Sequence, residues 1–483
     1  MKNKNTHLKL GLLRSSFLAI LLLVAASGFG GTVTVQFKTS AGVGISGVVP
    51  QYFLSGAWTN FTGSTDGTGS VSQTFTTGSL PFRINYAAGT LSLGTINVAT
   101  TQTVNAFTTL VTVNLKHYDG SLNTTESGVA EYYNGGWITI GSTSGGSVSK
   151  ELLPGSYPFH MIYHNSTEQV SVTIAGGSSS GNTQSIDFQT TKVTTSLKNH
   201  TGSAGISGSL SQYYTTTWYN IGITDASGDT VIELLPGSYY FNMNYNHFTY
   251  QTLSTTISAG APGTSWTQTI PFQTTLVTTS LVNHSGTPIS GAPAQYYSGT
   301  YYSIGSTNSS GDTAVELLPG SYYFTMTYNH AIQQLGPLTV GSGPYDTIPF
   351  QTMLVSENIK DCNGALISTS AGTAQYYSGG WWSFGTTSGG TVSKELLPGS
   401  YYFNMNYNGV LIQQGPITYS SGLTQNVDFS TTNVNFPTAS TASFSIPSPV
   451  SYMTISAPSA GVALFPGTYL FKTNAATAGR RGN

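Results

Sequence analysis

Glutamates that return at one fixed place in a repeated phrase are the first residues of this 483-residue chain that could do chemistry. They are Glu151, Glu233, Glu316 and Glu395. A general acid or base needs a partner carboxylate or surroundings that shift its pKa. No second carboxylate recurs at a fixed distance from them, so we expect exposed glutamates at strand ends without a catalytic role.

The histidines could instead form a metal site. His200 and His284 stand at equivalent places in the repeats, as do His247 and His330. A metal site needs several ligands held in one geometry, and no such set repeats. We therefore expect turn histidines and no bound metal. The histidines considered are His117, His160, His164, His200, His247, His284 and His330.

An acidic run and a single cysteine complete the candidates for chemistry. The run Asp-Ala-Ser-Gly-Asp at 225–229 hints at calcium, but the equivalent segments 144–146 and 388–390 hold no acid and predict a plain turn. Cys362 occupies a turn position that histidine holds in two other repeats. A nucleophile without a matching base indicates an incidental thiol, and one cysteine cannot form an intrachain disulfide. We predict that the chain is not an enzyme and carries no cofactor.

Aromatic pairs flank a short loop in four repeats. A three-residue loop between them would place each pair directly across a hairpin, on its outer face. Such cross-strand pairs stabilise a hairpin by about 0.2–1 kcal/mol. They could also stack on sugar rings or on a neighbouring chain, and both interpretations stay open. The candidate ligand or partner contacts are Tyr133 with Trp137, Tyr214 with Trp218, Tyr297 with Tyr301, and Tyr377 with Trp381.

The phrase that carries the glutamates reads Glu-Leu-Leu-Pro-Gly-Ser-Tyr and begins at residues 151, 233, 316 and 395. Degenerate relatives stand at 79–82 and 464–469. The copies are about 80 residues apart, which is too long for a solenoid coil and suits a small independent domain. A tandem array of near-identical modules favours reach, display or multivalent binding, since catalysis needs one unique constellation of residues.

The body of each repeat predicts strands. The segment 239–245 has apolar residues at its odd positions and mostly asparagine at its even ones, as in a strand with one buried face. Seven short strands per repeat, without helical periodicity, predict an all-β fold. We expect a tandem array of small immunoglobulin-like or transthyretin-like β-sandwich modules that forms an elongated rod. The predicted units are a signal peptide at 1–27, a divergent repeat at 30–109, repeats at 110–191, 192–275, 276–353 and 354–432, and a truncated repeat at 433–483.

Three turn signals come in a fixed order. They are Gly-Thr-Pro-Ile-Ser-Gly-Ala at 286–292, Thr-Asp-Ala-Ser-Gly at 224–228 and Leu-Pro-Gly-Ser-Tyr at 235–239. This order resembles that of the carboxypeptidase-regulatory-like and transthyretin-like modules of the immunoglobulin-like superfold, as in repeats of bacterial surface and adhesin-like proteins. The resemblance implies sandwich modules and a surface role, and because it rests on turn residues it bears on fold more than on function.

Composition and the first residues indicate an exported protein. Charged residues make up 7% of the chain and the formal net charge is −2, so the chain has no basic footprint for nucleic acid. Lysines 2, 4 and 9 and Arg14 precede an apolar run at 17–26 and then small residues, as in a secretory signal peptide. A run of about ten residues is too short to span a membrane. We expect a secreted protein, extracellular or at the cell surface, without a membrane span after signal cleavage.

Three roles remain open from the sequence. The first is a secreted non-enzymatic surface or extracellular-matrix repeat protein that acts as an adhesive or structural stalk. The second is multivalent carbohydrate binding by the aromatic hairpins. The third is a filament subunit, because the residues after 466–467 are too few for the closing strands of a module, and an open sheet edge accepts strands from other chains. The expected partners are accordingly a glycan, a surface protein or another copy of the chain.

Overall fold

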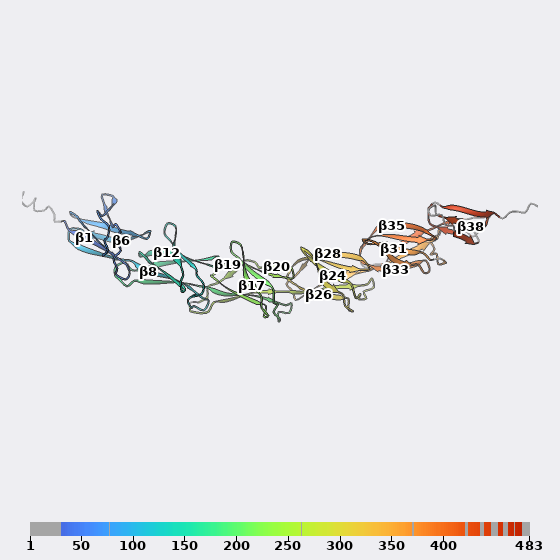
Figure 1. Ribbon diagram of the computed structural model, residues 1–483, viewed down its shortest axis with the longest axis horizontal. Helices are drawn as coiled ribbons and strands as arrows, with labels where there is room; N and C mark the ends of the chain where they lie inside the picture. The colour runs from blue at the N-terminus through green and yellow to red at the C-terminus, as the bar shows by residue number, and fades with distance from the viewer. Residues whose placement is uncertain are drawn as a thin grey trace, which may run out of the picture.

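The computed structural model describes residues 30–76, 78–261, 263–369, 371–420, 424–434, 439–445, 453–456, 462–467 and 469–475. The regular structure in these residues is all β-strand, as predicted. The strands group into sandwich modules that follow one another along the long axis of the molecule (Figure 1). The predicted signal peptide lies outside the described residues.

The first three modules contain strands β1 to β22. The first module holds β1 (Thr32–Lys38), β2 (Gln51–Leu54), β3 (Ala57–Asn60), β4 (Ser70–Thr74), β5 (Ser79–Tyr86), β6 (Gly89–Asn97) and β7 (Gln102–Phe107). The second holds β8 (Thr109–Lys116), β9 (Val129–Tyr133), β10 (Trp137–Ser142), β11 (Ser147–Leu152), β12 (Gly155–Tyr163), β13 (Ser166–Ile174) and β14 (Thr183–Gln189). The third holds β15 (Thr191–Lys198), β16 (Leu210–Tyr214), β17 (Trp218–Ile223), β18 (Asp229–Leu234), β19 (Gly237–Tyr245), β20 (Phe248–Gln251), β21 (Thr255–Ile257) and β22 (Thr267–Gln273).

The last three modules contain strands β23 to β41. The fourth holds β23 (Thr275–Val282), β24 (Pro293–Ser298), β25 (Thr300–Ser306), β26 (Asp312–Leu317), β27 (Gly320–Tyr328), β28 (Ala331–Val340) and β29 (Tyr345–Gln351). The fifth holds β30 (Met353–Lys360), β31 (Thr373–Tyr377), β32 (Trp381–Thr386), β33 (Thr391–Leu396), β34 (Gly399–Tyr407), β35 (Val410–Tyr419) and β36 (Gln425–Ser430). The sixth holds β37 (Thr432–Val434), β38 (Ala439–Ser445), β39 (Met453–Ser456), β40 (Val462–Leu464) and β41 (Leu470–Ala475).

Each of the first five modules packs a three-stranded sheet on a larger one. In the second module the order is β11-β8-β14 in one sheet and β10-β9-β12-β13 in the other. The first strand of a module pairs in parallel with its last strand, as β8 does with β14. This pairing brings the end of one module to the start of the next, and a single threonine separates the two strands. The threonines are Thr108, Thr190, Thr274, Thr352 and Thr431.

Alternation along the strands builds the cores. In β19 the side chains of Tyr239, Phe241 and Met243 are buried, on the face that the sequence predicts. One segment differs from expectation, because the strand expected around 252–257 is only the short β21 at 255–257, and β20 precedes it at 248–251; the two pair with different parts of β19. The first three modules have separate cores, whereas the fourth and fifth share one continuous cluster.

The sixth module forms two small sheets. Among the described residues β37 pairs with β40, and β38 lies between β39 and β41. These pairings match those of the first five strands of the fifth module. The expected absence of closing strands stays a prediction, as do the module boundaries given above.

Glu357 places a carboxyl group inside the fifth module. It stands in the middle of β30 with no exposed surface, and neither of its carboxyl oxygens has a hydrogen-bond partner among the described residues. Burial raises the pKa of Glu357 to about 9. The equivalent positions of the preceding modules hold Val113, Thr195 and Thr279. The buried carboxyl is therefore a destabilising group peculiar to this module.

We expect the fifth module to lose stability as pH rises. The folded-state pKa of Glu357 lies above its ordinary value of 4.5. The stabilising effect of the bound proton is thus complete below pH 4.5, and it is lost as the pH rises toward the folded-state pKa of about 9. Glu357→Gln cannot titrate and should remove up to about 4 kcal/mol of pH dependence between pH 5 and pH 8. Hydrogen exchange of β30 and β36, corrected for intrinsic rates, measures this pH dependence of stability. Equal slopes of stability against pH in the wild type and in Glu357→Gln would contradict the prediction.

Candidate functional site at the module junctions

The two adjacent leucines of the repeated phrase point into different modules. Leu234, at the end of β18, belongs to the core of its own third module, whereas Leu235 lies in the core of the second. Leu152 and Leu153 are divided in the same way between the second and first modules. Strand alternation imposes this, because neighbouring side chains lie on opposite faces. The residues at this place of the phrase are here called plug residues. Leu153, Leu235, Leu318 and Phe465 lie in the preceding core, and Leu397 lies in the cluster that the fourth and fifth modules share.

A tyrosine four residues after each plug residue fixes its backbone. The hydroxyl of Tyr239 donates to the carbonyl of Leu235 at 2.7 Å, and that of Tyr157 donates to the carbonyl of Leu153 at 3.1 Å. In the second to fifth modules this tyrosine is the third residue of the long strand that begins at the glycine of the Pro-Gly turn. The phrase Leu-Pro-Gly-Ser-Tyr thus holds the plug residue against the adjoining core, in addition to turning the chain. The same bond recurs at Tyr322, Tyr401 and Tyr469.

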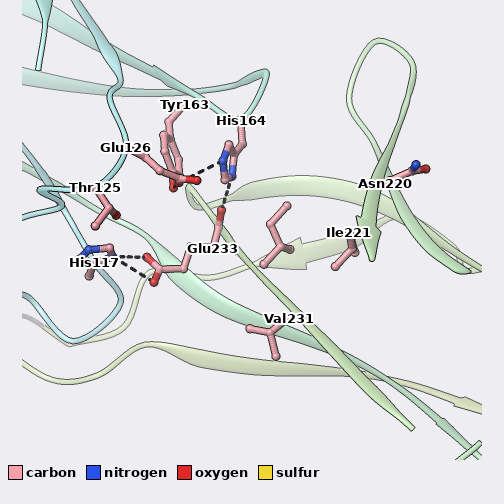
Figure 2. Close-up of a pocket in the computed structure, with 10 residues that line it drawn as sticks. His117, Thr125, Glu126, Tyr163, His164, Asn220, Ile221, Val231 and Glu233 are labelled. Atoms are coloured by element: carbon pink, nitrogen blue, oxygen red, sulfur yellow. Dashed lines mark hydrogen bonds and ion pairs between the residues drawn. The ribbon is translucent and has the colours of Figure 1, made fainter. Parts of the chain in front are cut away.

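The repeated glutamates bind the module before their own. The carboxylate of Glu233 lies 3.1 Å from Nδ1 of His117, in the first turn of the second module (Figure 2). The same carboxylate accepts a hydrogen bond from the hydroxyl of Thr190. The Glu233 side chain is 21% exposed. The expectation of exposed strand-end glutamates is therefore wrong, because their partners lie in another module, far away in sequence.

Four junctions carry this arrangement, here called the carboxylate lock. Each lock joins a turn residue and the separating threonine of one module to the glutamate of the next. At the first junction Ser40 takes the place of histidine, and its hydroxyl donates to Glu151 at 2.7 Å. The locks are Ser40–Thr108–Glu151, His117–Thr190–Glu233, His200–Thr274–Glu316 and His284–Thr352–Glu395.

A hairpin tip forms a second contact, here called the turn clasp. At the third junction the side-chain amide of Asn246 donates to the carbonyl of Glu316 at 2.7 Å. The carbonyl of Asn246 accepts from the hydroxyl of Tyr296 at 3.0 Å, and the ring of His247 stacks on Tyr302 at 3.7 Å. Asn246 and His247 have positive φ angles of 45° and 61°, a conformation in which asparagine and histidine are enriched.

The fourth junction repeats the turn clasp with other residues. The amide of Asn329 donates to the carbonyl of Glu395 at 2.8 Å, and the ring of His330 stacks on Trp382 at 3.5 Å. The hydroxyl of Ser378 donates to the carbonyl of His330 at 2.9 Å. The equivalent histidines His247 and His330 thus act in module docking, a role that the local sequence pattern does not indicate.

The second junction differs because it has a histidine in place of the clasp asparagine and opens into a cavity of about 520 Å³ (Figure 2). Nδ1 of His164 lies 3.0 Å from the carbonyl oxygen of Glu233, and Nε2 lies 3.2 Å from the carboxylate of Glu126. The hydroxyl of Tyr163 also donates to Glu126. Burial is the main cause that raises the pKa of Tyr163, and the hydrogen bond to the Glu126 carboxylate raises it further.

The arrangement in this cavity favours docking over catalysis. Both ring nitrogens of His164 lie against oxygen atoms of the junction, one at the carbonyl of Glu233 and the other at the carboxylate of Glu126. Glu233 is occupied by His117 and Thr190. Among the described residues, no three His, Cys, Asp or Glu side chains gather to hold a metal ion.

No helix in the described part of the chain is long and apolar enough to cross a membrane.

The aromatic pairs lie across their hairpins, with the rings edge to face in three pairs and tilted in Tyr214 with Trp218. Ring centroids are 5.1–5.4 Å apart in all four pairs. A third ring joins three of them, from Tyr240, Tyr323 and Tyr402. In the second module the imidazole of His160 instead stacks on Trp137 at 3.2 Å. The structure brings together Tyr133 with Trp137, Tyr214 with Trp218, Tyr297 with Tyr301, and Tyr377 with Trp381.

Two other sequence candidates do not form sites. Cys362 is an exposed free cysteine. Asp225 accepts backbone hydrogen bonds from Ser227 and Asp229, as in a plain turn.

Comparisons with known proteins find only distant likeness. No family model matches the chain, and no curated protein matches it. Among solved structures, the Bacillus anthracis TIE protein is 11% identical, with 67% of this chain and 74% of that one covered and a TM-score of 0.17. The streptococcal ancillary pilin is 12% identical, with 50% and 98% covered and a TM-score of 0.18. The open pilus adhesin SpaC from Lactobacillus rhamnosus GG is 11% identical, with 86% and 58% covered and a TM-score of 0.18. These likenesses are too weak to carry an argument about function.

The two leucines at one junction predict opposite effects. Leu235→Ala should destabilise the second module by about 2–5 kcal/mol, because it opens a cavity in that core. The adjacent Leu234→Ala should instead destabilise the third module by a similar amount. Hydrogen exchange read separately for β8 and β15 distinguishes them. Both variants weakening only the third module would contradict the assignment of Leu235 as a plug residue.

Proposed function

We propose that the protein is a non-enzymatic stalk of the extracellular space or cell surface, whose modules are docked into a semi-rigid rod. The observation that carries this proposal is the junction. The plug residue, with its tyrosine bond, recurs at all five junctions, and the carboxylate lock recurs at four. A contact that recurs from module to module serves length and stiffness, whereas a catalytic site would need one distinctive place.

The physics of the junction supports stiffness. Fully burying a leucine side chain is worth about 1.5–3 kcal/mol, and each lock adds hydrogen bonds to a carboxylate that are stronger than neutral ones. Only one residue separates consecutive modules, as Thr190 does between β14 and β15. Bending at such a joint would have to break contacts that several residues make together. The predicted signal peptide and the scarcity of charge fit a place outside the cell.

Stiffness can be measured directly. X-ray scattering and electron microscopy of the mature chain should give one extended contour. Leu235→Ala combined with Glu233→Ala should create a bend at the second junction, because both the plug residue and the lock are lost there. The matched control is Leu234→Ala with Glu131→Ala, which alters the same two types of residue without touching the junction. Wild-type particles bent equally at every junction would refute a semi-rigid rod.

A multivalent glycan-binding surface is a second candidate function. The rings of Tyr297, Tyr377 and Trp381 are 36–40% exposed. Beside one aromatic pair, the amide of Gln212 donates to Asn220 at 2.8 Å, so uncharged polar groups flank the rings. Sugars bind such surfaces by stacking and hydrogen bonding, and repetition along a rod raises avidity. This candidate concerns the same residues that stabilise the hairpins, and its partner would be a neutral polysaccharide.

The modules differ in a way that tests this second candidate. His160 covers a face of Trp137, and Arg83 lies 4.1 Å over the ring of Trp58. Trp218→Ala and Trp381→Ala should each lower binding of the full chain to immobilised neutral polysaccharides several-fold. Trp137→Ala should lower binding less, because one face of its ring is already stacked on His160, and it serves as the comparison. Equal effects of all three substitutions, or no binding by the wild type, would remove this candidate.

The filament alternative receives less support from the first module. The first module carries Thr74 at the position of the lock glutamate. It carries Thr76, which is exposed, at the position of the plug residue. A second copy could therefore not receive the first module through the junction that joins the other modules. Self-association would need a different contact.

A further inference from the structure

The fifth junction lacks the carboxylate lock. In β37 and β40, Asn433 stands opposite Ala463, as Leu354 stands opposite Glu395 one module earlier. Ala463 therefore occupies the position of the lock glutamate, and its methyl side chain cannot accept the hydrogen bonds that the glutamate carboxylate accepts. The turn position of the lock histidine is held by Cys362. Two of the three members of the lock are thus replaced together.

The third member remains, and its hydroxyl has lost its acceptor. Thr431 is 4% exposed, and its hydroxyl oxygen is buried without a hydrogen-bond partner among the described residues. At the fourth junction the equivalent Thr352 donates to Glu395. A buried hydroxyl without a partner destabilises the docked arrangement, since undocking lets water reach it.

The turn clasp is also reduced at this junction. Asn408 donates to the carbonyl of Ala463 at 3.3 Å, compared with 2.8 Å for Asn329 at the fourth junction. Gly409 follows Asn408 where histidine stands at the two preceding junctions, so no ring can stack on the next module. The plug residue is kept, because Phe465 is buried in the cluster of the fifth module and packs near Tyr407.

We propose that the fifth junction is a compliant joint, at which the sixth module undocks and reorients while the first five modules remain one stiff segment. The side chain of Phe465 still anchors the sixth module to the fifth. Because the carboxylate lock is missing, the sixth module can rotate about this contact. The device has a direct mechanical meaning for a stalk. A load or a partner at the C-terminal module would change its direction without bending the shaft.

Hydrogen exchange of the full chain tests the joint against its own neighbour. The segments that dock at the fifth junction are 361–365 and 463–467, and their counterparts at the fourth are 283–287 and 395–399. The wild-type fifth junction should exchange faster by at least on the order of tenfold, because hydrogen bonds to a carboxylate are missing. Equal exchange at the two junctions would overturn the proposal.

Two variants exchange the properties of these junctions. The double substitution Ala463→Glu with Cys362→His rebuilds the lock and should slow exchange at the fifth junction to the rate of the fourth. Glu395→Ala removes a lock and should speed exchange at the fourth junction alone. If the rebuilt variant does not fold, Glu395→Ala still decides, since unchanged exchange at 283–287 would mean that the lock does not control docking. Circular dichroism and tryptophan fluorescence establish that each variant is folded.

Discussion

The array depends on one constraint of strand geometry, which is that two adjacent leucines cannot enter the same side of a sheet. Leu234 fills its own core, so Leu235 must be covered by something else, and the second module supplies the cover. If no neighbouring module covered this second leucine, a large apolar side chain would be left in water at every repeat. The short connections and the parallel pairing of first and last strands then place the neighbouring core where the leucine needs it.

Polar contacts give this apolar contact a defined orientation. A plug residue alone fixes a point, about which one module could rotate relative to the next. The carboxylate lock and the turn clasp add contacts on either side, and they use groups with directional hydrogen bonds. Glu316 serves both, because its carboxylate binds His200 and Thr274 while its carbonyl accepts from Asn246. One residue of the repeated phrase thus joins three segments of the preceding module.

Much of the fold could be predicted from the sequence because it depends on local pattern. Alternation in 239–245 identified β19 and its buried face, and the Pro-Gly turns marked where strands begin. The junctions could not be predicted because their partners are distant in sequence, with a separation of 116 positions from His117 to Glu233. The leucine doublet was nevertheless a usable signal, since a strand can bury only one of two neighbours in its own core. The displacement of His117 by one residue concealed its equivalence to His200, although both reach the same glutamate position.

The borrowed leucine also orders events during synthesis. A chain that emerges with its N-terminus first presents the second module before the segment that contains Leu235. That module can pair its strands at once, but its core lacks a side chain until the start of β19 has emerged and been held by Tyr239. Each module therefore reaches its final packing one step late, when its successor begins to form. Such nearest-neighbour completion is the behaviour of a one-dimensional cooperative array. During synthesis, the module that has most recently emerged is therefore always the one whose core is still incomplete.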